Sequence, residues 1–210
     1  MNVLLIDGHP GSGHLTSHLT DLYEAALPAN AQSTRVALRD LAYEPLTMTA
    51  YATAKPWEPD LAALARALDA CDHLVIVFPM WWGSEPALVK DTLERILLPH
   101  FAFRQHNDDA WWDKLLAGRT ADVIITMDTP AWYLKWFYNN ALVVRWRKQV
   151  LGFCGIERVR VATLSPVRLG GAEKNLPKWA ARIAKFAGSI KPAKAAKENH
   201  LNAFLAYKGF

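Results

Sequence analysis

Five short runs of apolar and β-branched residues recur along the chain and predict β-strands. They span residues 3–6, 34–38, 73–78, 122–126 and 158–163. The first, third and fourth runs are almost continuously apolar, which is typical of central strands in a parallel sheet covered on both faces. The pattern therefore predicts a sheet whose three most apolar strands lie in its interior.

Helix-forming segments separate these strands. The predicted helices span residues 15–26, 60–70, 86–98, 138–153 and 176–190. The first has apolar residues at helical spacing, and the second consists of helix formers. Pro86 suits the first turn of the third helix, and glycines at 152 and 155 end the fourth. Strand and helix thus alternate along the chain.

This alternation predicts an α/β fold with right-handed crossovers. We expect a flavodoxin-like, doubly wound, five-stranded parallel sheet with strand order 2-1-3-4-5, which places ligands at the carboxyl ends of the strands. Residues 1–191 are expected to form one domain, followed by a basic tail over residues 192–210. Two long loops are expected at residues 42–59 and 99–114.

The tail has two possible states. Its apolar residues allow it to dock on the domain, and without such docking it would be loose. The residues expected to dock are Phe204, Leu205 and Tyr207.

Composition narrows the class of protein. The chain has 210 residues, of which 51% are hydrophobic and 21% charged, enough for one globular domain. No run of eighteen apolar residues occurs, so no membrane span is expected. The first residues have no basic stretch and reach Asp7 after a short apolar run, which indicates a strand and not a signal peptide. A cytoplasmic location is therefore expected.

Charge and cysteine content exclude further classes. The net charge is +4, with much of the excess between Lys174 and Lys208, and no nucleic-acid motif accompanies it. We interpret it as a solvated basic tail and expect no nucleic-acid partner. Cys71 and Cys154 belong to no CxxC pair, so we expect two reduced, mostly buried thiols. The nine tryptophans point to an aromatic-lined pocket.

The first candidate site is the segment Gly8–Thr16, which follows the first strand and opens the first helix. A helix N-terminus offers unpaired N–H groups and a partial positive charge, and glycines let an anion approach the backbone. Ser12, Thr16 and Ser17 can add hydroxyl donors. The segment matches neither the P-loop nor the dinucleotide fingerprint. Phosphate binding is expected, and an ordinary capped turn is the alternative.

Three histidines lie in or beside this segment. His14 and His18 are four residues apart on the predicted helix, and His9 is near. A zinc site needs a further ligand in a matching motif, and none is visible. We therefore expect no metal, and we place an imidazole beside the phosphate instead.

The second candidate site is the segment Phe78–Ala87, which leaves the third strand and leads into the next helix. A flavin ring needs a flat apolar wall and N–H groups that face its polar edge. Trp81 and Trp82 offer the wall, and Gly83 lets the chain turn. The alternative is an aromatic turn that only packs the following helix. The residues alone leave both open.

Three segments carry a resemblance to a known family. Pro79–Lys90, PMWWGSEPALVK, resembles the P-L-x-W-x-S-x-P-A-x-x-K signature of the NAD(P)H:quinone reductase-like flavoproteins, which have a flavodoxin-like fold. The opening GHP with His14-Leu15-Thr16 resembles their phosphate loop. Arg39–Pro45 resembles the family segment after the second strand. The resemblance runs in register over about residues 1 to 165.

The resemblance implies a bound FAD or FMN, with NAD(P)H as co-substrate. The implied phosphate contacts are His9, His14, Leu15, Thr16 and Ser17. The implied contacts to the flavin ring are Pro79, Met80, Trp81, Trp82 and Gly83, with Thr126, Met127, Asp128 and Thr129 at its other edge. Trp132 and Tyr133 would line the nicotinamide or quinone side.

The chain also departs from this family. Family members often have Thr-Thr-Gly-Gly after the fourth strand, with Tyr and His beyond. Here Met127, Asp128 and Pro130 interrupt that pattern, and the next histidine is His200. No Tyr/His pair for proton relay is present, so Tyr133 is the one candidate catalytic residue. The resemblance retains the cofactor and leaves the substrate open.

The resemblance implies a flavin-dependent NAD(P)H oxidoreductase that passes a hydride to a quinone or similar small acceptor. One alternative is a regulatory ancillary subunit of a potassium-efflux transporter, because such subunits resemble the same family. Another is an electron-carrier flavodoxin, which the basic charge and the missing Ser/Thr-rich phosphate loop disfavour. A fold without flavin, in which the aromatic loop is only core, is a third. The choices between FMN and FAD and between NADH and NADPH stay open, although Arg39–Pro45 favours FAD.

Family members are dimers whose flavin pocket is completed by the second subunit, so the resemblance also implies a homodimer. Aromatic side chains on the surface would suit such an interface. The candidates are Trp111, Trp112, Trp132 and Trp136.

Overall fold

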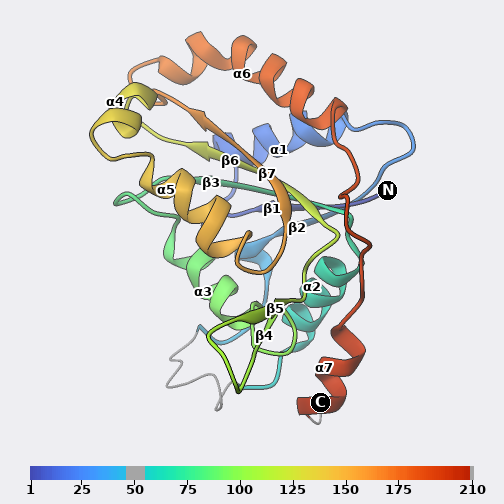
Figure 1. Ribbon diagram of the computed structural model, residues 1–210. Coiled ribbons are helices and arrows are strands. Elements are labelled where there is room, and N and C mark those ends of the chain that lie inside the picture. Colours follow the sequence, from blue (N-terminus) through green and yellow to red (C-terminus); the bar gives the residue numbers. More distant parts are fainter. Residues whose placement is uncertain (46–54, 209–210) are drawn as a thin grey trace.

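A computed structural model describes residues 1–45 and 55–208 of the chain. Its centre is a five-stranded parallel sheet in the order β2-β1-β3-β6-β7 (Figure 1). The strands are β1 (Asn2–Asp7), β2 (Gln32–Ala37), β3 (His73–Pro79), β6 (Thr120–Thr126) and β7 (Glu157–Leu164). Counted among themselves along the chain, these strands have the order 2-1-3-4-5. The predicted flavodoxin-like α/β fold and its parallel sheet are confirmed.

Helices cover both faces of this sheet (Figure 1). They are α1 (Leu15–Ala25), α2 (Pro59–Ala70), α3 (Ala87–Ile96), α4 (Ala131–Trp136), α5 (Ala141–Val144), α6 (Gly171–Gly188) and α7 (Leu201–Lys208), with a short 3₁₀ turn at Leu38–Asp40. Side chains alternate between the two faces of a strand. In β1, Val3 and Leu5 therefore pack in one core with α1 and α6, whereas Leu4 and Ile6 pack in the other with α2 and α3. This two-sided burial explains the continuous apolar runs of the central strands.

The predicted helix over residues 138–153 is wrong at its start. Asn139 and Asn140 have left-handed backbone angles, with φ of 49° and 52°. Two such residues interrupt a helix, so α4 ends before them and α5 begins after them. The helix then continues as a π-helical turn over Arg145–Val150. π-Helical turns are rare and occur frequently at functional sites.

Other helix boundaries also differ from expectation. Pro86 precedes α3 as its N-cap and is not part of its first turn. The last predicted helix was expected from residue 176, but α6 already begins at Gly171 and includes Pro177. Proline is over-represented in the first turn of helices, so Pro177 favours a helix that starts near residue 176.

The predicted long loop over residues 99–114 is wrong in part, because it contains an antiparallel pair of strands. These are β4 (Phe103–Gln105) and β5 (Trp112–Lys114), which form a separate two-stranded sheet. The other expected loop, 42–59, lies partly outside the described residues.

The tail docks on the domain through α7. The Phe204 ring is fully buried and lies 4.6 Å from the Trp57 ring and 5.7 Å from the Phe101 ring, measured between centroids. Docking, the first of the two expected states, is therefore observed for Phe204. The division into a domain over 1–191 and a tail over 192–210 stays a prediction.

Two further expectations concern the state of the cysteines and the presence of a membrane-spanning helix. Cys71 and Cys154 are free and buried, as predicted, and burial raises the pKa of each thiol to about 12. Among the described residues, no helix is long and apolar enough to cross a membrane.

Candidate functional site

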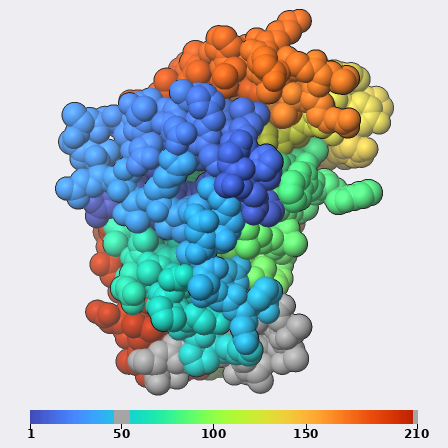
Figure 2. Space-filling model, turned by 180° about the vertical axis from the view of Figure 1, so that it is seen from behind, coloured from blue at the N-terminus to red at the C-terminus, as the bar shows by residue number. Residues whose placement is uncertain are grey.

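Three loops leave the carboxyl edge of the sheet side by side. Strands β1, β3 and β6 are neighbours in the sheet and end at Asp7, Pro79 and Thr126. Their following loops contain the two segments singled out in the sequence and the segment implied by the resemblance. The loop after β3 projects from the surface next to the N-terminal part of the chain (Figure 2). This edge is therefore where the predicted site residues meet.

A buried carboxylate anchors the loop after β1. Asp7 is fully buried, and its Oδ2 accepts hydrogen bonds from Ser17 Oγ at 2.6 Å and from the Arg39 guanidinium at 2.6 Å. Its Oδ1 accepts one from the His9 N–H at 3.2 Å. Burial acts to raise the pKa of Asp7, but the ion pair and the hydrogen bonds outweigh it and lower that pKa below its usual value. Asp7 thus stays ionised and holds the loop against α1.

The two histidines of this loop contact each other. The rings of His9 and His14 stack with centroids 3.8 Å apart, and His9 meets the Trp81 ring edge-on at 5.5 Å. Burial lowers the pKa of His9, and the neighbouring His14 adds to this, because two protonated imidazoles repel. The Gly11 N–H donates to His9 Nδ1 at 2.9 Å, which orients the ring. The structure thus brings the first and second candidate segments into contact.

The start of α1 has unpaired hydrogen-bonding groups. His14 is the N-cap of α1 and makes no side-chain capping bond, so the first N–H groups of the helix have no such partner. Thr16 lies in this first turn, and its buried Oγ1 has no hydrogen-bond partner among the described residues. Ser17 differs, because its hydroxyl already donates to Asp7. The segment thus offers donors that the protein itself leaves unused.

The second segment forms a tight hairpin. Trp81 and Ser84 exchange backbone hydrogen bonds of 2.9 and 3.0 Å around Trp82 and Gly83. Both central residues have positive φ, 51° and 77°, which is the pattern of a type I′ turn. Glycine adopts this conformation freely, whereas a tryptophan there is strained. The Met80 N–H is used inside the sheet, where it donates to the Thr126 carbonyl at 2.7 Å.

The two tryptophans of this hairpin do not form one wall, contrary to expectation. The Trp81 side chain is about half exposed and faces His9, whereas the Trp82 side chain is fully exposed. Only Trp81 therefore offers a ring surface next to the other residues of the site.

A buried carboxylate also lies behind this hairpin. Glu85 is buried, and its Oε2 accepts hydrogen bonds from Ser84 Oγ at 3.0 Å and Trp146 Nε1 at 3.2 Å. The same oxygen forms an ion pair with Arg145. Glu85 Oε1 is buried and has no partner among the described residues. The hairpin is thereby tied to the π-helical turn.

The loop after β6 borders the site from the other side. Met127 is buried in the core, with its N–H donating to the Leu164 carbonyl at 3.0 Å. Asp128 is exposed and accepts a hydrogen bond from the Arg168 N–H at 2.8 Å. Thr129 is half-buried. The Met127 side chain is thus part of the packing, and the exposed part of this loop begins at Asp128.

Aromatic rings cluster on α4 and just after it. Tyr133 stacks on Phe137 with ring centroids 4.5 Å apart and meets Trp132 edge-on at 5.5 Å. Trp132, Trp136 and Phe137 are each more than half exposed. Trp112 is an exception among the expected interface residues, because it stacks on Phe153 at 4.5 Å. Exposed aromatic clusters of this kind often mark binding surfaces.

Sequence reasoning missed Asp7, Glu85 and Arg145 as parts of this arrangement. Glu85 occupies an unspecified position of the family signature, so only the unusual charge between Ser84 and Pro86 signalled it. No group of three or more potential metal ligands occurs among residues 1–45 and 55–208.

Comparisons with known proteins agree with the fold of the chain. A sequence model of the family described as "Flavodoxin-like fold" matches residues 1–187. An uncharacterized NAD(P)H oxidoreductase of Escherichia coli is 31% identical over 101 residues, which are 45% of this chain and 51% of that protein. NAD(P)H dehydrogenase (quinone) 1 of Rattus norvegicus is 30% identical over 104 residues, which are 47% of this chain and 37% of that protein. The chain thus spans about half the length, or less, of these curated relatives.

A solved structure is similar over almost the whole chain. It is an FMN-dependent NADH-azoreductase of Bacillus anthracis in complex with FMN, with a TM-score of 0.70 and 16% identity over 89% of this chain and 98% of that one. At this identity, the similarity concerns the fold alone.

Proposed function

Since the chain belongs to the flavodoxin-like fold family, we propose that it is a flavin-dependent oxidoreductase that passes a hydride from NAD(P)H to a quinone or similar small acceptor. One observation carries this proposal. His9 of the loop after β1 contacts Trp81 of the hairpin after β3 at the carboxyl edge of the sheet. In parallel α/β sheets, ligands bind at this edge.

The loop after β1 fits the phosphate of a flavin nucleotide. The uncapped start of α1 has N–H donors and the positive end of the helix dipole, and Thr16 adds a buried hydroxyl without a partner. His14 and Leu15 directly precede Thr16 in the chain. Ser17 would take part by holding Asp7, which keeps the loop in place.

The hairpin after β3 fits the ring of the flavin. Trp81 offers a half-exposed apolar face. Pro79 ends the strand before the turn, and Gly83 is one of the two central residues of the turn. Asp128 and Thr129 would border the opposite edge of the ring. Met80 and Met127 would hold these two loops in place through backbone hydrogen bonds, which their N–H groups donate to carbonyls of the neighbouring strands.

When bound, a flavin supplies the chemistry of accepting and releasing a hydride. The protein orients and shields the reactants. Trp132 and Tyr133 would line the side on which nicotinamide and acceptor enter in turn. The Tyr133 ring lies between those of Trp132 and Phe137, and its hydroxyl would donate a proton to a reduced acceptor.

The similar proteins support this chemistry. The Escherichia coli relative is named an NAD(P)H oxidoreductase, and the rat relative is named an NAD(P)H dehydrogenase (quinone). The Bacillus anthracis protein binds FMN. We therefore propose FMN or FAD as the cofactor. The cytoplasmic location stays a prediction.

The absorption spectrum of the freshly purified protein tests the cofactor. We expect a flavin spectrum, and mass spectrometry of the heat-released compound will distinguish FMN from FAD. Flavin-loaded protein is then mixed with NADH or NADPH without oxygen, and bleaching of the flavin is followed. Failure to bind either flavin, or failure of both nicotinamides to bleach it, would refute the proposal.

We also propose that two copies associate next to this site. Trp82 is fully exposed, and Trp132 and Trp136 are 59% and 71% exposed at the same edge of the sheet. Large aromatic side chains are enriched in protein interfaces. Light scattering should give about twice the chain mass of 23.5 kDa. A single-chain mass at micromolar concentration would contradict a stable dimer.

A further inference from the structure

A groove lies between α3 and the π-helical turn Arg145–Val150. None of the residues proposed to contact the flavin lines it, although Arg145, which pairs with Glu85 behind the hairpin, does. Its volume is about 340 Å³, which is within the range of small-molecule pockets. One wall is the face of α3 that contains Lys90 and Leu93, and the short strand β4 closes one end. The groove is therefore a separate space with its own chemistry.

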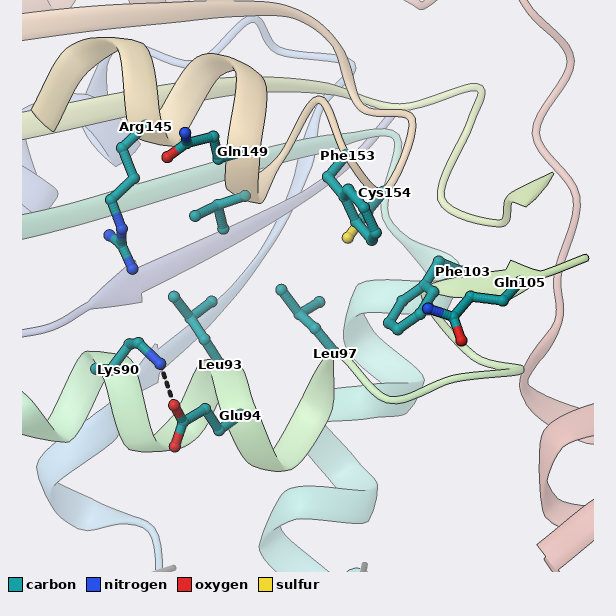
Figure 3. Close-up of a pocket in the computed structure, with 11 residues that line it drawn as sticks. Lys90, Leu93, Glu94, Leu97, Phe103, Gln105, Arg145, Gln149, Phe153 and Cys154 are labelled. Carbon is teal, nitrogen blue, oxygen red and sulfur yellow. Dashed lines mark hydrogen bonds and ion pairs between the residues drawn. The ribbon is translucent and has the colours of Figure 1, made fainter. Parts of the chain in front are cut away.

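The two ends of this groove differ. Figure 3 shows the Arg145 side chain reaching from the π-helical turn toward α3, where Lys90 lies nearby. At the other end, Phe103 and Phe153 meet edge-to-face with ring centroids 5.1 Å apart, and Leu97 lies beside them. One end thus offers the N–H donors of Arg145 and Lys90, with the Glu94 carboxylate beside Lys90, and the other offers aliphatic and aromatic carbon.

The cations at the polar end retain donor capacity. Among the described residues, Arg145 is paired only with Glu85, through one terminal nitrogen. A guanidinium has five N–H donors in a planar fork, so most of those of Arg145 remain for a ligand. Lys90 pairs with Glu94 one helical turn away, and both side chains are more than a third exposed. Such surface pairs are weak and rearrange easily.

We propose that this groove binds a small carboxylic acid with a flat apolar body, such as an aryl carboxylate. The carboxylate would lie on Arg145 and Lys90, and the ring would lie against Leu97, Phe103 and Phe153. The unused N–H donors of Arg145 select a carboxylate, which matches the guanidinium fork and would replace Glu94 as the partner of Lys90. A small inorganic anion would leave the apolar end unfilled. This inference does not depend on flavin binding.

Isothermal titration of the full chain with 2-naphthoate tests the proposal. The matched compound is 2-naphthalenemethanol, which keeps the ring and lacks the charge. We expect saturable binding of naphthoate, and binding of the alcohol weaker by about tenfold, because the charge-assisted hydrogen bonds are lost.

Three variants locate the site. Arg145→Gln should weaken naphthoate binding by about tenfold, and Leu97→Trp should weaken it similarly by filling the apolar end. Lys148→Gln is the control, because Lys148 is exposed on the same turn and does not line the groove. Thermal unfolding checks that each variant is folded. If Arg145→Gln does not fold, the double variant Glu85→Gln/Arg145→Gln is tested in its place, because it removes both charges of the ion pair together.

Several results would overturn the proposal. They are the absence of saturable naphthoate binding, equal affinity for the alcohol, and unchanged binding in both the Arg145 and Leu97 variants. The proposal would also be overturned if a second copy of the chain occupied the groove. In that case light scattering would give a dimer for the wild type, a monomer for Leu97→Trp, and no naphthoate binding by the dimer.

Discussion

Glu85 and Arg145 form an ion pair that joins the hairpin after β3 to the π-helical turn, across 60 residues of sequence. Glu85 is buried on its strand-to-helix connection, and Arg145 reaches it from the helix that follows β6. Trp146 adds a hydrogen bond from the next position of the same turn. The irregular helix therefore supports the hairpin that presents Trp81.

Removal of one partner of this pair should destabilise the protein. Arg145→Ala leaves the buried Glu85 carboxylate without its cation, and such losses cost about 3–5 kcal/mol when both partners are buried. Because Arg145 is partly exposed, we expect a loss of about 2 kcal/mol in the free energy of unfolding, measured in urea. Arg147→Ala on the same turn is the control. Equal unfolding curves for wild type and Arg145→Ala would mean that the ion pair contributes nothing.

Asp7 should make stability depend on pH in the acid range. Its pKa is lower in the folded protein than its usual value, mainly because the bonds from Arg39 and Ser17 outweigh burial. The stabilisation is therefore complete above about pH 4 and is lost as the pH falls through the lowered folded pKa. Asp7→Asn should be less stable by about 2 kcal/mol at neutral pH.

Urea unfolding at several pH values measures this effect. The difference between wild type and Asp7→Asn should shrink below about pH 4, because the wild-type carboxylate becomes protonated there. A difference that stays constant down to pH 2 would contradict the assignment of the lowered pKa to Asp7.

We expect the Trp82 side chain to serve function, and we expect its presence at this turn position to lower the stability of the protein. The Trp82 backbone is left-handed at φ 51° in a type I′ turn followed by Gly83, and Asn-Gly is the preferred sequence there. Trp82→Asn should therefore raise the free energy of unfolding by up to about 1 kcal/mol. If the Trp82 side chain completes a site or an interface, activity or dimer formation should fall in the same variant.

Calorimetry and light scattering on Trp82→Asn measure these two effects. Trp111→Asn is the matched control, because Trp111 is also exposed and lies away from the hairpin, next to β5. A destabilised Trp82→Asn protein would show that the ring packs favourably in spite of its exposure.

Removal of the Tyr133 hydroxyl should lower kcat and leave the affinity for flavin unchanged. Tyr133→Phe keeps the stacking on Phe137 and removes the hydroxyl, so flavin affinity should not change. If the hydroxyl donates a proton to the acceptor, kcat should fall by about a hundredfold, as is typical of general acid catalysis. Tyr138→Phe in the same aromatic cluster is the control. Equal kcat values for Tyr133→Phe and wild type would exclude the hydroxyl from the reaction.

Much of the fold could be read from local patterns. The apolar and β-branched runs located all five parallel strands. The runs of β1, β3 and β6 are almost continuously apolar because these strands are buried on both faces, whereas the edge strand β2 is mostly exposed. Helix starts after loops were also located, as for α1 at Leu15. The break at Asn139 and Asn140 was missed, because asparagine also occurs inside helices and its enrichment in the left-handed region is only a weak local signal.

In the candidate site, too, some features follow from local sequence and others only from tertiary packing. The sequence by itself determined which loops lie at the carboxyl edge, because strand order and chain direction place Gly8–Thr16 next to the segment after β3. It also predicted His9 and Trp81 as site residues, and the structure brings these two side chains into contact. Glycine and aromatic residues at strand ends are local signals, and a short window of sequence contains them.

Only the tertiary structure decided which buried charges pair. Asp7 pairs with Arg39, and Glu85 pairs with Arg145, over 32 and 60 residues of sequence. It also decided that Trp81 faces the loop after β1 whereas Trp82 points to solvent. The reason is physical: a buried charge is stable only beside its partner, and a side chain's direction follows from backbone angles. Both depend on how distant segments pack and not on neighbouring residues alone.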